Sequence, residues 1–349
     1  MSRPILWLAA SLDVEEEGLF GGRYDCRTPT VGNTSCLPRL APLLERGLRP
    51  TLFCAYSVLT DAASRRELAR LRDRHGAEIA AHLHHWNTPP LDDGPAMRHA
   101  VPAAALDAQT FRAKMRCLLT AGKDFQGEDL RSFRMGRWDL HRQHWPVLAE
   151  LGLTCDASVR PLHGARCDAH GQRTRPDHFA APHTPYAVRT DWGEILEVPL
   201  SVVPLTSALP ALIRRLPSGL RQRAEGGFPH WGALSLLPVE HPLPVMQYMT
   251  RRFVAAGGRV LSLTWHSSEL MPGGAPHMPD EAHVARFITK ISRYLDWLPT
   301  IGELRYLTMQ DIRREMRQVP VPVCPSCADW SVAPARGDVP ISPGLQEHS

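Results

Sequence analysis

The sequence predicts an α/β fold, in the form of a parallel barrel of seven or eight strand–helix units. Short apolar runs rich in Leu, Ile and Val alternate with segments whose apolar residues recur at helical spacing. So many units within 349 residues favour a parallel barrel over an open sheet. We expect one barrel domain over residues 1–318, followed by a Pro-rich, aperiodic and disordered tail over residues 319–349.

The apolar runs and the helical segments alternate along the chain. Strands are expected at residues 4–13, 50–59, 77–82, 131–136, 153–158, 194–201 and 259–266. Helices are expected over residues 61–75, 107–121, 145–151, 245–256 and 280–297, and the short segment 304–309 closes the series. Residues 157–193 and 202–242 are too long for ordinary connections, so we expect elaborations near an active-site face.

Composition and charge are those of an ordinary globular protein. The apolar fraction is 43%, the charged fraction is 22% and the net charge is +4, so we expect no nucleic-acid partner. The arginines at 214, 215, 221 and 223 indicate a solvated face, with peripheral contact to an anionic membrane as the alternative. Without a signal peptide or an apolar run long enough to span a bilayer, we expect a cytoplasmic protein with no integral membrane segment.

Ionisable side chains collect at the ends of five expected strands. These ends read "LDVEEE", "HLHH", "FRMGRWD", "CDAS" and "WHSSE". In a parallel barrel the carboxyl ends of the strands form one rim, where the loops build the active site. The sequence therefore predicts one shared pocket lined by these residues.

The first strand end carries two carboxylates with the spacing of a reactive pair. Asp13 and Glu15 are two residues apart, so both can project toward the rim. One of them can bind a metal ion while the other accepts a proton. Asp13 directly follows an apolar run, whereas Glu16 and Glu17 fit a solvated acidic turn.

The third strand end carries three histidines. His82, His84 and His85 can wrap around one ion together with a carboxylate, and two histidines with one carboxylate are a common ligand set of hydrolytic metal sites. The alternative is that they are hydrogen-bonded histidines of the core.

Two further strand ends offer an arginine and a histidine. Arg134 precedes Met135 and Gly136, where a close turn can aim the guanidinium at a carboxylate or at substrate; the alternative is a structural salt bridge. His266 ends a strand of strong β character and is placed to act as a general acid; the alternative is a buried, hydrogen-bonded histidine.

Taken in order, seven stretches resemble the polysaccharide deacetylases of carbohydrate esterase family 4, which share the NodB-homology fold. The likeness runs from about Leu6 to Arg314, and within the family it is greatest to the WalW-like branch linked to lipopolysaccharide and exopolysaccharide biosynthesis. The stretches are "SLDVEEE", "PTLFCAYSVL", "EIAAHLHHWNTPP", "SFRMGRWDL", "LTCDASV", "ILEVPLS" and "LTWHSSELMPGGAPH".

The resemblance implies a distorted (β/α) barrel of seven or eight units, of the NodB-homology type. It also implies a metal-dependent hydrolase that removes an N- or O-acetyl group from a sugar. Asp13 matches the catalytic base, and Arg134 matches the arginine that pairs with and orients it. Glu15 stands at the position of the metal carboxylate, and His82 matches the first metal histidine. His266 matches the acid that protonates the leaving group, and the expected divalent ion is Zn²⁺. Asp156 lies in a "DAS" segment common to the group, with no assigned role.

The chain departs from the family pattern in two places. Most relatives place the second metal histidine four residues after the first, where this chain has Trp86. His84 or His85 must then be the ligand, and we prefer His84 because the "HLH" spacing leaves His85 free. The second departure is Glu15, where an aspartate is usual.

We expect a deacetylase that acts on an acetylated sugar of a nucleotide-linked or lipid-linked precursor of a cell-surface polysaccharide. One alternative is a catalytically silent carbohydrate-binding or scaffold protein with the same fold. Another is a zinc amidohydrolase that acts on a non-sugar amide. Trp86, Trp138 and Trp265 lie beside the motifs and are expected either to stack on sugar faces or to pack in the barrel.

Overall fold

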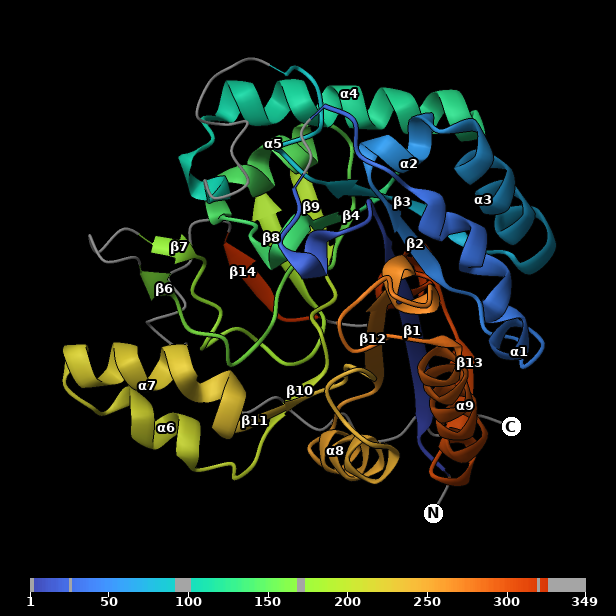
Figure 1. The fold of residues 1–349 in the computed structure, drawn as a ribbon. Coiled ribbons are helices and arrows are strands. Elements are labelled where there is room, and N and C mark those ends of the chain that lie inside the picture. The colour runs from blue at the N-terminus through green and yellow to red at the C-terminus, as the bar shows by residue number, and fades with distance from the viewer. Residues whose placement is uncertain (1–2, 25–26, 92–101, 168–172, 319–320, 326–349) are drawn as a thin grey trace, which may run out of the picture.

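A mixed, mostly parallel sheet forms the centre of the molecule (Figure 1). The computed structural model describes residues 3–24, 27–91, 102–167, 173–318 and 321–325. Within these residues the strands of the main sheet run in the order β12-β1-β2-β3-β4-β5-β9-β8-β14, with β13 also paired to β1. They are β1 (Ile5–Val14), β2 (Thr51–Cys54), β3 (Glu78–Leu83), β4 (Ser132–Met135), β5 (Cys155–Asp156), β8 (Tyr186–Thr190), β9 (Gly193–Glu197), β12 (Val260–His266), β13 (Glu303–Tyr306) and β14 (Val323–Pro325).

Helices cover the outer side of this sheet. Figure 1 shows α2 and α3 beside β2 and β3, and α9 beside β13 and β1. The helix α4 packs against β3 and α2. The helices are α1 (Ala41–Leu44), α2 (Tyr56–Thr60), α3 (Ala62–His75), α4 (Ala108–Gln126), α5 (Trp145–Glu150), α6 (Leu209–Arg214), α7 (Ser218–Trp231), α8 (Leu243–Ala255), α9 (Glu281–Trp297) and α10 (Met309–Met316). None of the helices in the described ranges is both long enough and apolar enough to cross a membrane.

The strand pairing confirms the predicted α/β class. Every pairing from β12 through β1, β2, β3, β4 and β5 to β9 is parallel. The sheet also curls back on itself, because the backbone N–H of Ser201, just after β9, donates to the carbonyl of Ser262 in β12 at 3.4 Å. In the opposite direction, the N–H of Ser262 donates to Ser201 Oγ at 2.9 Å. The barrel is thus distorted: the segment between β9 and β10 contacts β12, and among the described residues no ladder pairs β9 with β12.

Three long helices begin at aspartates that cap them. Asp61, Asp107 and Asp280 each accept a hydrogen bond from a backbone N–H three residues later, at the start of α3, α4 and α9. Such a cap stabilises a helix by about 1 kcal/mol. Gly76 ends α3 in the left-handed region, with a φ of 64°, as the sequence predicted.

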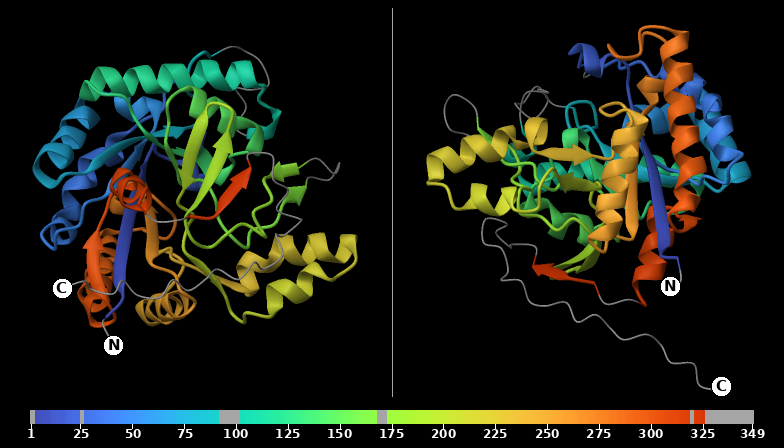
Figure 2. Two further views of the ribbon diagram at one scale, coloured as in Figure 1. Left: turned by 180° about the vertical axis from the view of Figure 1, so that it is seen from behind. Right: turned by 90° about the horizontal axis from the view of Figure 1, so that it is seen from below.

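The long segments after β5 and β9 build the part of the molecule that lies farthest from α3. They carry the two-stranded ladders β6 (Arg166–Cys167) with β7 (Arg173–Arg175) and β10 (Val202–Pro204) with β11 (Ala233–Ser235), and the helices α6 and α7. Both views of Figure 2 show α6 and α7 projecting from the body of the molecule. Their apolar side chains contribute to a separate small core around Ile213 and Phe228.

The predicted tail is structured over a short piece. Val323–Pro325 forms β14, which pairs in parallel with β8, and the N–H of Ala187 donates to the carbonyl of Pro322 at 2.8 Å. This piece adds to the open edge of β8, and the expected disorder of the tail as a whole stays a prediction. Residues 319–320 and 326–349 lie outside the described residues.

Candidate active site

The parallel ladders bring four of the predicted strand ends to one point. Asp13 of β1 lies directly opposite His266 of β12, and His82 of β3 lies opposite Arg134 of β4. All four residues stand at the carboxyl ends of their strands, so their side chains meet at one rim, as the sequence predicted.

Asp13 lies at the centre of this group and is buried. Its Oδ1 accepts a hydrogen bond of 2.6 Å from Arg134 Nη1. Its Oδ2 lies 3.7 Å from His266 Nε2 and 4.0 Å from His82 Nε2. One carboxylate oxygen is therefore held by an ion pair, while the other faces the histidines and is placed to accept a proton.

Arg134 is fully buried and all its contacts are internal. Besides Asp13, its guanidinium donates to Thr264 Oγ1 and to Ser11 Oγ, both at 2.9 Å, and to the carbonyl of Ala157 at 3.0 Å. Of the roles weighed from the sequence, the structure favours pairing with a carboxylate. These four hydrogen bonds fix the guanidinium, which in turn holds Asp13 in one orientation.

Glu15, His82 and His84 form a group of side chains able to hold a metal ion. One ligand atom from each residue lies within 4.8 Å of the other two, and all three residues are buried. Glu15 Oε2 lies 3.3 Å from His82 Nε2 and 3.2 Å from His84 Nε2. Two imidazole nitrogens and one carboxylate oxygen are a ligand set that suits Zn²⁺ and related divalent ions.

The outer nitrogen of each imidazole is fixed by a partner behind it. His82 Nδ1 donates to the carbonyl of Arg134 at 2.9 Å, and His84 Nδ1 donates to Glu16 Oε1 at 2.7 Å. With the proton on Nδ1, each ring can present an Nε2 lone pair to an ion. This arrangement is the one expected of metal-binding histidines, so the three residues fit a divalent metal ion.

Glu16 corrects an expectation drawn from the sequence. It was expected in a solvated acidic turn, yet it is only 1% exposed. Its Oε1 also accepts hydrogen bonds from Trp86 Nε1 at 3.2 Å and from Asn87 Nδ2 at 2.6 Å. The sequence around Glu16 resembles a solvent-facing turn because the side chains that donate hydrogen bonds to Glu16 come from the segment after β3. The one signal in the sequence was Trp86, whose large apolar side chain directly after the histidines indicates a buried segment.

The turn of the chain after β3 places His84, but not His85, beside Glu15 and His82. His84 joins Glu15 and His82, whereas His85 is buried beside Trp86, with the ring centroids 5.1 Å apart. Trp86 stacks on His84 at a centroid distance of 4.3 Å. At the usual position of the second histidine, the chain thus carries a buried side chain that supports His84.

Gly136 allows β4 to approach His84 closely. A Cβ added at this glycine would lie 2.3 Å from His84 Cδ2 and 2.7 Å from the carbonyl oxygen of Leu83. Any larger side chain would displace the His84 ring. The close turn predicted after Arg134 is therefore required by the packing of His84.

Charge interactions within the group shift the pKa values in the direction opposite to burial. Burial alone would raise the pKa of Glu15, but the charge of His266 and hydrogen bonds from the two histidines hold it below its usual value. Burial would lower the pKa of His84, yet Glu16 and Glu15 raise it to about 10. The ion-free group therefore holds a proton at His84, which a cation must displace.

His266 is held by a carboxylate that sequence reasoning did not assign. Glu269 accepts from the backbone N–H of His266 at 2.8 Å, and its Oε2 lies 3.5 Å from His266 Nδ1. Burial would lower the pKa of His266, but Glu15 and Glu269 raise it to about 9. His266 is therefore protonated near neutral pH and can donate a proton. The other oxygen of Glu269 accepts from His277 at 2.8 Å.

The remaining predicted side chains take different places. Asp156 does not join the group: it accepts hydrogen bonds from Trp145 Nε1 at 2.9 Å and Ser158 Oγ at 2.5 Å. Trp86, Trp138 and Trp265 all line a cavity of 330 Å³ next to Asp13 and His266. Trp86 and Trp265 are fully buried, whereas Trp138 is partly exposed. The guanidinium groups of Arg134 and Arg160 lie 4.6 and 5.6 Å from the centre of the Trp138 ring.

Solved structures share this fold. A protein of Mycobacterium smegmatis described as a polysaccharide deacetylase superposes with a TM-score of 0.54 at 17% identity, over 92% of this chain and 93% of that one. A Pseudomonas aeruginosa protein of the same description gives 0.51 at 15% identity, over 90% and 91%. A protein of Parabacteroides distasonis described as a glycoside hydrolase/deacetylase gives 0.54 at 10% identity, over 92% and 72%. Comparison of the sequence with family models and with curated proteins gives no match.

The chain therefore has the fold of these solved structures. This confirms the fold that the ordered motifs predicted, and membership of carbohydrate esterase family 4 stays a prediction. The placement of the chain in the WalW-like branch stays a prediction.

Proposed function

We propose that the protein is a metal-dependent deacetylase that hydrolyses an N- or O-acetyl group on a sugar of a cell-surface polysaccharide precursor. One observation carries the proposal. Asp13 and His266 stand opposite each other across a parallel ladder, within 3.7 Å, directly beside the Glu15, His82 and His84 group. A carboxylate base, a protonated imidazole and a candidate metal group thus converge on one cavity.

Glu15, His82 and His84 would hold the divalent ion, for which Zn²⁺ is our first choice. A bound ion would act as a Lewis acid on the acetyl carbonyl and on water. The chain's own residues then supply the proton transfers.

Asp13 takes the proton from the attacking water at Oδ2, the oxygen that is not bonded to Arg134. Arg134 prevents the carboxylate from rotating, because it holds the other oxygen at 2.6 Å. His266 delivers a proton to the departing amine or alcohol, and Glu269 keeps its ring oriented and charged. A general base or acid of this kind contributes about 10²- to 10⁴-fold to rate.

Acetate release tests the proposal. The protein is stripped of metal, reloaded with Zn²⁺ and assayed on N- and O-acetylated sugars and on small non-sugar amides. We expect release that depends on the ion and falls at least about 100-fold in Asp13→Asn. Asp191→Asn makes the same change on the exposed turn between β8 and β9 and serves as the matched control.

Three outcomes contradict the proposal in different ways. Release that is indifferent to metal removal would refute the metal group. Activity of Asp13→Asn within tenfold of the wild type would refute Asp13 as the base. Turnover of small amides alone would favour an amidohydrolase, and sugar binding without any turnover would favour a silent binding protein.

A further inference from the structure

Helices α6 and α7 form a hairpin whose outer end is exposed. Both helices project from the body of the molecule (Figure 2). The last residue of α7, Trp231, adjoins β11, so its first residue, Ser218, lies at the end of the helix away from β11. The 14 residues of α7 span roughly 20 Å. Every residue from Arg215 to Leu220, in the turn between the helices and at the start of α7, is exposed. We call residues 212–223 the hairpin tip.

The hairpin tip exposes three leucines. Leu212 is 54% exposed, Leu216 is 39% exposed and Leu220 is 59% exposed. They follow one another at intervals of four residues, whereas the neighbouring Ile213 is buried in the small core of this part of the molecule. Single exposed leucines are common on protein surfaces, but several close together at a projecting tip indicate a contact surface.

Positive charge accompanies these leucines. Residues 205–232 contain four arginines and a single acidic residue, Glu225. Glu225 Oε1 lies 3.9 Å from Arg221 Nε, so the one carboxylate faces that arginine. Arg215 and Arg223 are exposed, and within the described chain neither side chain has an ion-pair or hydrogen-bond partner. The hairpin tip thus keeps two unpaired cationic groups close to its leucines.

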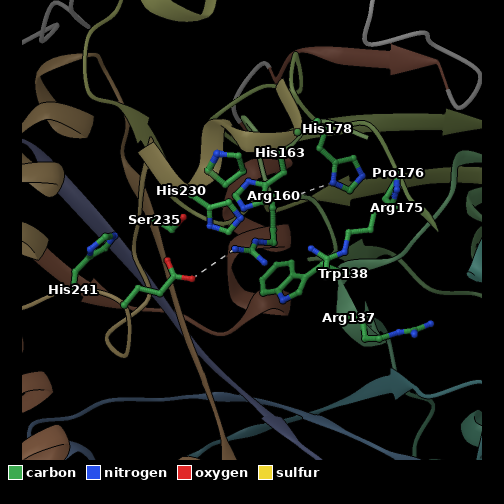
Figure 3. Close-up of a pocket in the computed structure, with 14 residues that line it drawn as sticks. Arg137, Trp138, Arg160, His163, Arg175, Pro176, His178, His230, Ser235 and His241 are labelled. Atoms are coloured by element: carbon green, nitrogen blue, oxygen red, sulfur yellow. Dashed lines mark hydrogen bonds and ion pairs between the residues drawn. The ribbon is translucent and has the colours of Figure 1, made fainter. Parts of the chain in front are cut away.

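The inner end of α7 lines a cavity next to the candidate active site. This cavity measures 440 Å³, and Figure 3 shows His230, from the end of α7, among the side chains around it. It shares Trp138 with the 330 Å³ cavity that contains Asp13 and His266. A surface bound at the hairpin tip would therefore lie about one helix length, roughly 20 Å, from this cavity.

We propose that the hairpin tip binds the surface of an anionic membrane, with its leucines in the interfacial region and Arg215 and Arg223 at the headgroups. Apolar side chains and arginines that lie together on a surface bind anionic bilayers in this way. The exposed leucines favour membrane contact over a solvated face, the two interpretations that the arginines alone left open. In a two-fold contact with a second copy, the arginines of one tip would face those of the other. The proposal does not depend on the reaction at Asp13.

Vesicle flotation tests the proposal without any turnover. The full chain is mixed with vesicles of phosphatidylcholine alone, or of phosphatidylcholine with about 30% phosphatidylserine, and the partition coefficient is measured at low and high salt. We expect the anionic vesicles to bind the protein at least about tenfold more tightly than the neutral ones. The binding should weaken as salt is added, because salt screens exposed charges.

Variants of exposed residues assign the binding to the hairpin tip. We expect Arg215→Gln and Arg223→Gln each to lower the partition coefficient about fivefold, since each basic residue near an anionic surface contributes about 1 kcal/mol. Leu220→Ser should lower it at least about fivefold, because its side chain would no longer leave water. Arg293→Gln on α9 and Leu91→Ser make the same changes at exposed positions elsewhere and should stay within about twofold of the wild type. The far-UV circular dichroism spectra should be unchanged.

Three outcomes would overturn the proposal. The first is the absence of binding to the anionic vesicles, and the second is a loss in Arg293→Gln or Leu91→Ser equal to that in the tip variants. The third is a dimer that Leu220→Ser dissociates, without vesicle binding, which would make a second copy the partner of the tip. Amide exchange of residues 212–223 should slow on anionic vesicles if the proposal holds. None of these measurements uses acetate release, so the deacetylase and the membrane contact can fail separately.

Discussion

Replacing His84 should remove the candidate metal ion, whereas replacing its neighbour His85 should not. His84 Nε2 lies 3.2 Å from Glu15 Oε2 inside the three-residue group, and His85 lies outside that group. Removing a residue that only hydrogen-bonds to a metal ligand weakens metal affinity by about 10- to 100-fold. We therefore expect His84→Gln to weaken Zn²⁺ affinity by at least about 100-fold.

The loss of affinity translates into a loss of stability. At free Zn²⁺ equal to about 100 times the wild-type Kd, the ion stabilises the folded wild type by about 2.7 kcal/mol. A 100-fold weaker site at the same concentration gains only about 0.4 kcal/mol. The difference corresponds to roughly 3 °C in the melting temperature of a chain of this size.

Thermal unfolding with Zn²⁺ and with chelator measures this difference directly, and metal content after dialysis checks it. His85→Gln makes the same substitution at an equally buried neighbour, so it controls for the disturbance of the core. An ion-dependent shift that survives in His84→Gln and disappears in His85→Gln would refute our assignment of the second histidine.

Three other changes probe the surroundings of the site. Trp138→Ala should raise KM for sugars with little change in stability, whereas Trp86→Ala, in a fully buried position, should cost about 3–5 kcal/mol in a urea titration; equal costs would contradict these positions. Burial lowers the pKa of His144 to about 4, below its unfolded value, so stability is present above about pH 6.5 and is lost as the pH falls. Between pH 7 and pH 5 this loss is about 2 kcal/mol and should be absent in His144→Gln. Burial and the charge of Asp156 raise the pKa of Glu197 above its unfolded value, so the wild type loses stability as the pH rises. At pH 8 the free energy of unfolding of Glu197→Gln should therefore be equal to or greater than that of the wild type. The difference between the two should shrink as the pH is lowered toward 5.

The strand ends could be predicted from the sequence because two local signals coincide there. Each apolar run that ends in an ionisable residue fixes both the end of a strand and the rim to which its side chain points, as with Asp13, His82, Arg134 and His266. The start of α3 and its end at Gly76 were likewise local, since capping depends on neighbouring residues.

Features that depend on distant parts of the chain could not be predicted. Glu16 is buried because donors from the loop after β3 reach it, and nothing within its own turn shows this. The β8–β9 hairpin and the pair β10–β11 consist of short strands whose partners define them. The helix α10 was missed although Thr308 and Asp311 form a capping box, a signal present in the sequence.

The pairing of β1 with β12 separates a rigid part of the molecule from a compliant one. Asp13 and His266 can move apart only if the main-chain ladder between two buried strands opens, which requires the core to unfold. The helices α6 and α7 rest instead on a small apolar cluster of their own and keep many side chains in solvent. Amide exchange should accordingly be slowest at Asp13 and His266 and faster in α6 and α7. Motion of α6 and α7 can thus leave the distance between Asp13 and His266 unchanged.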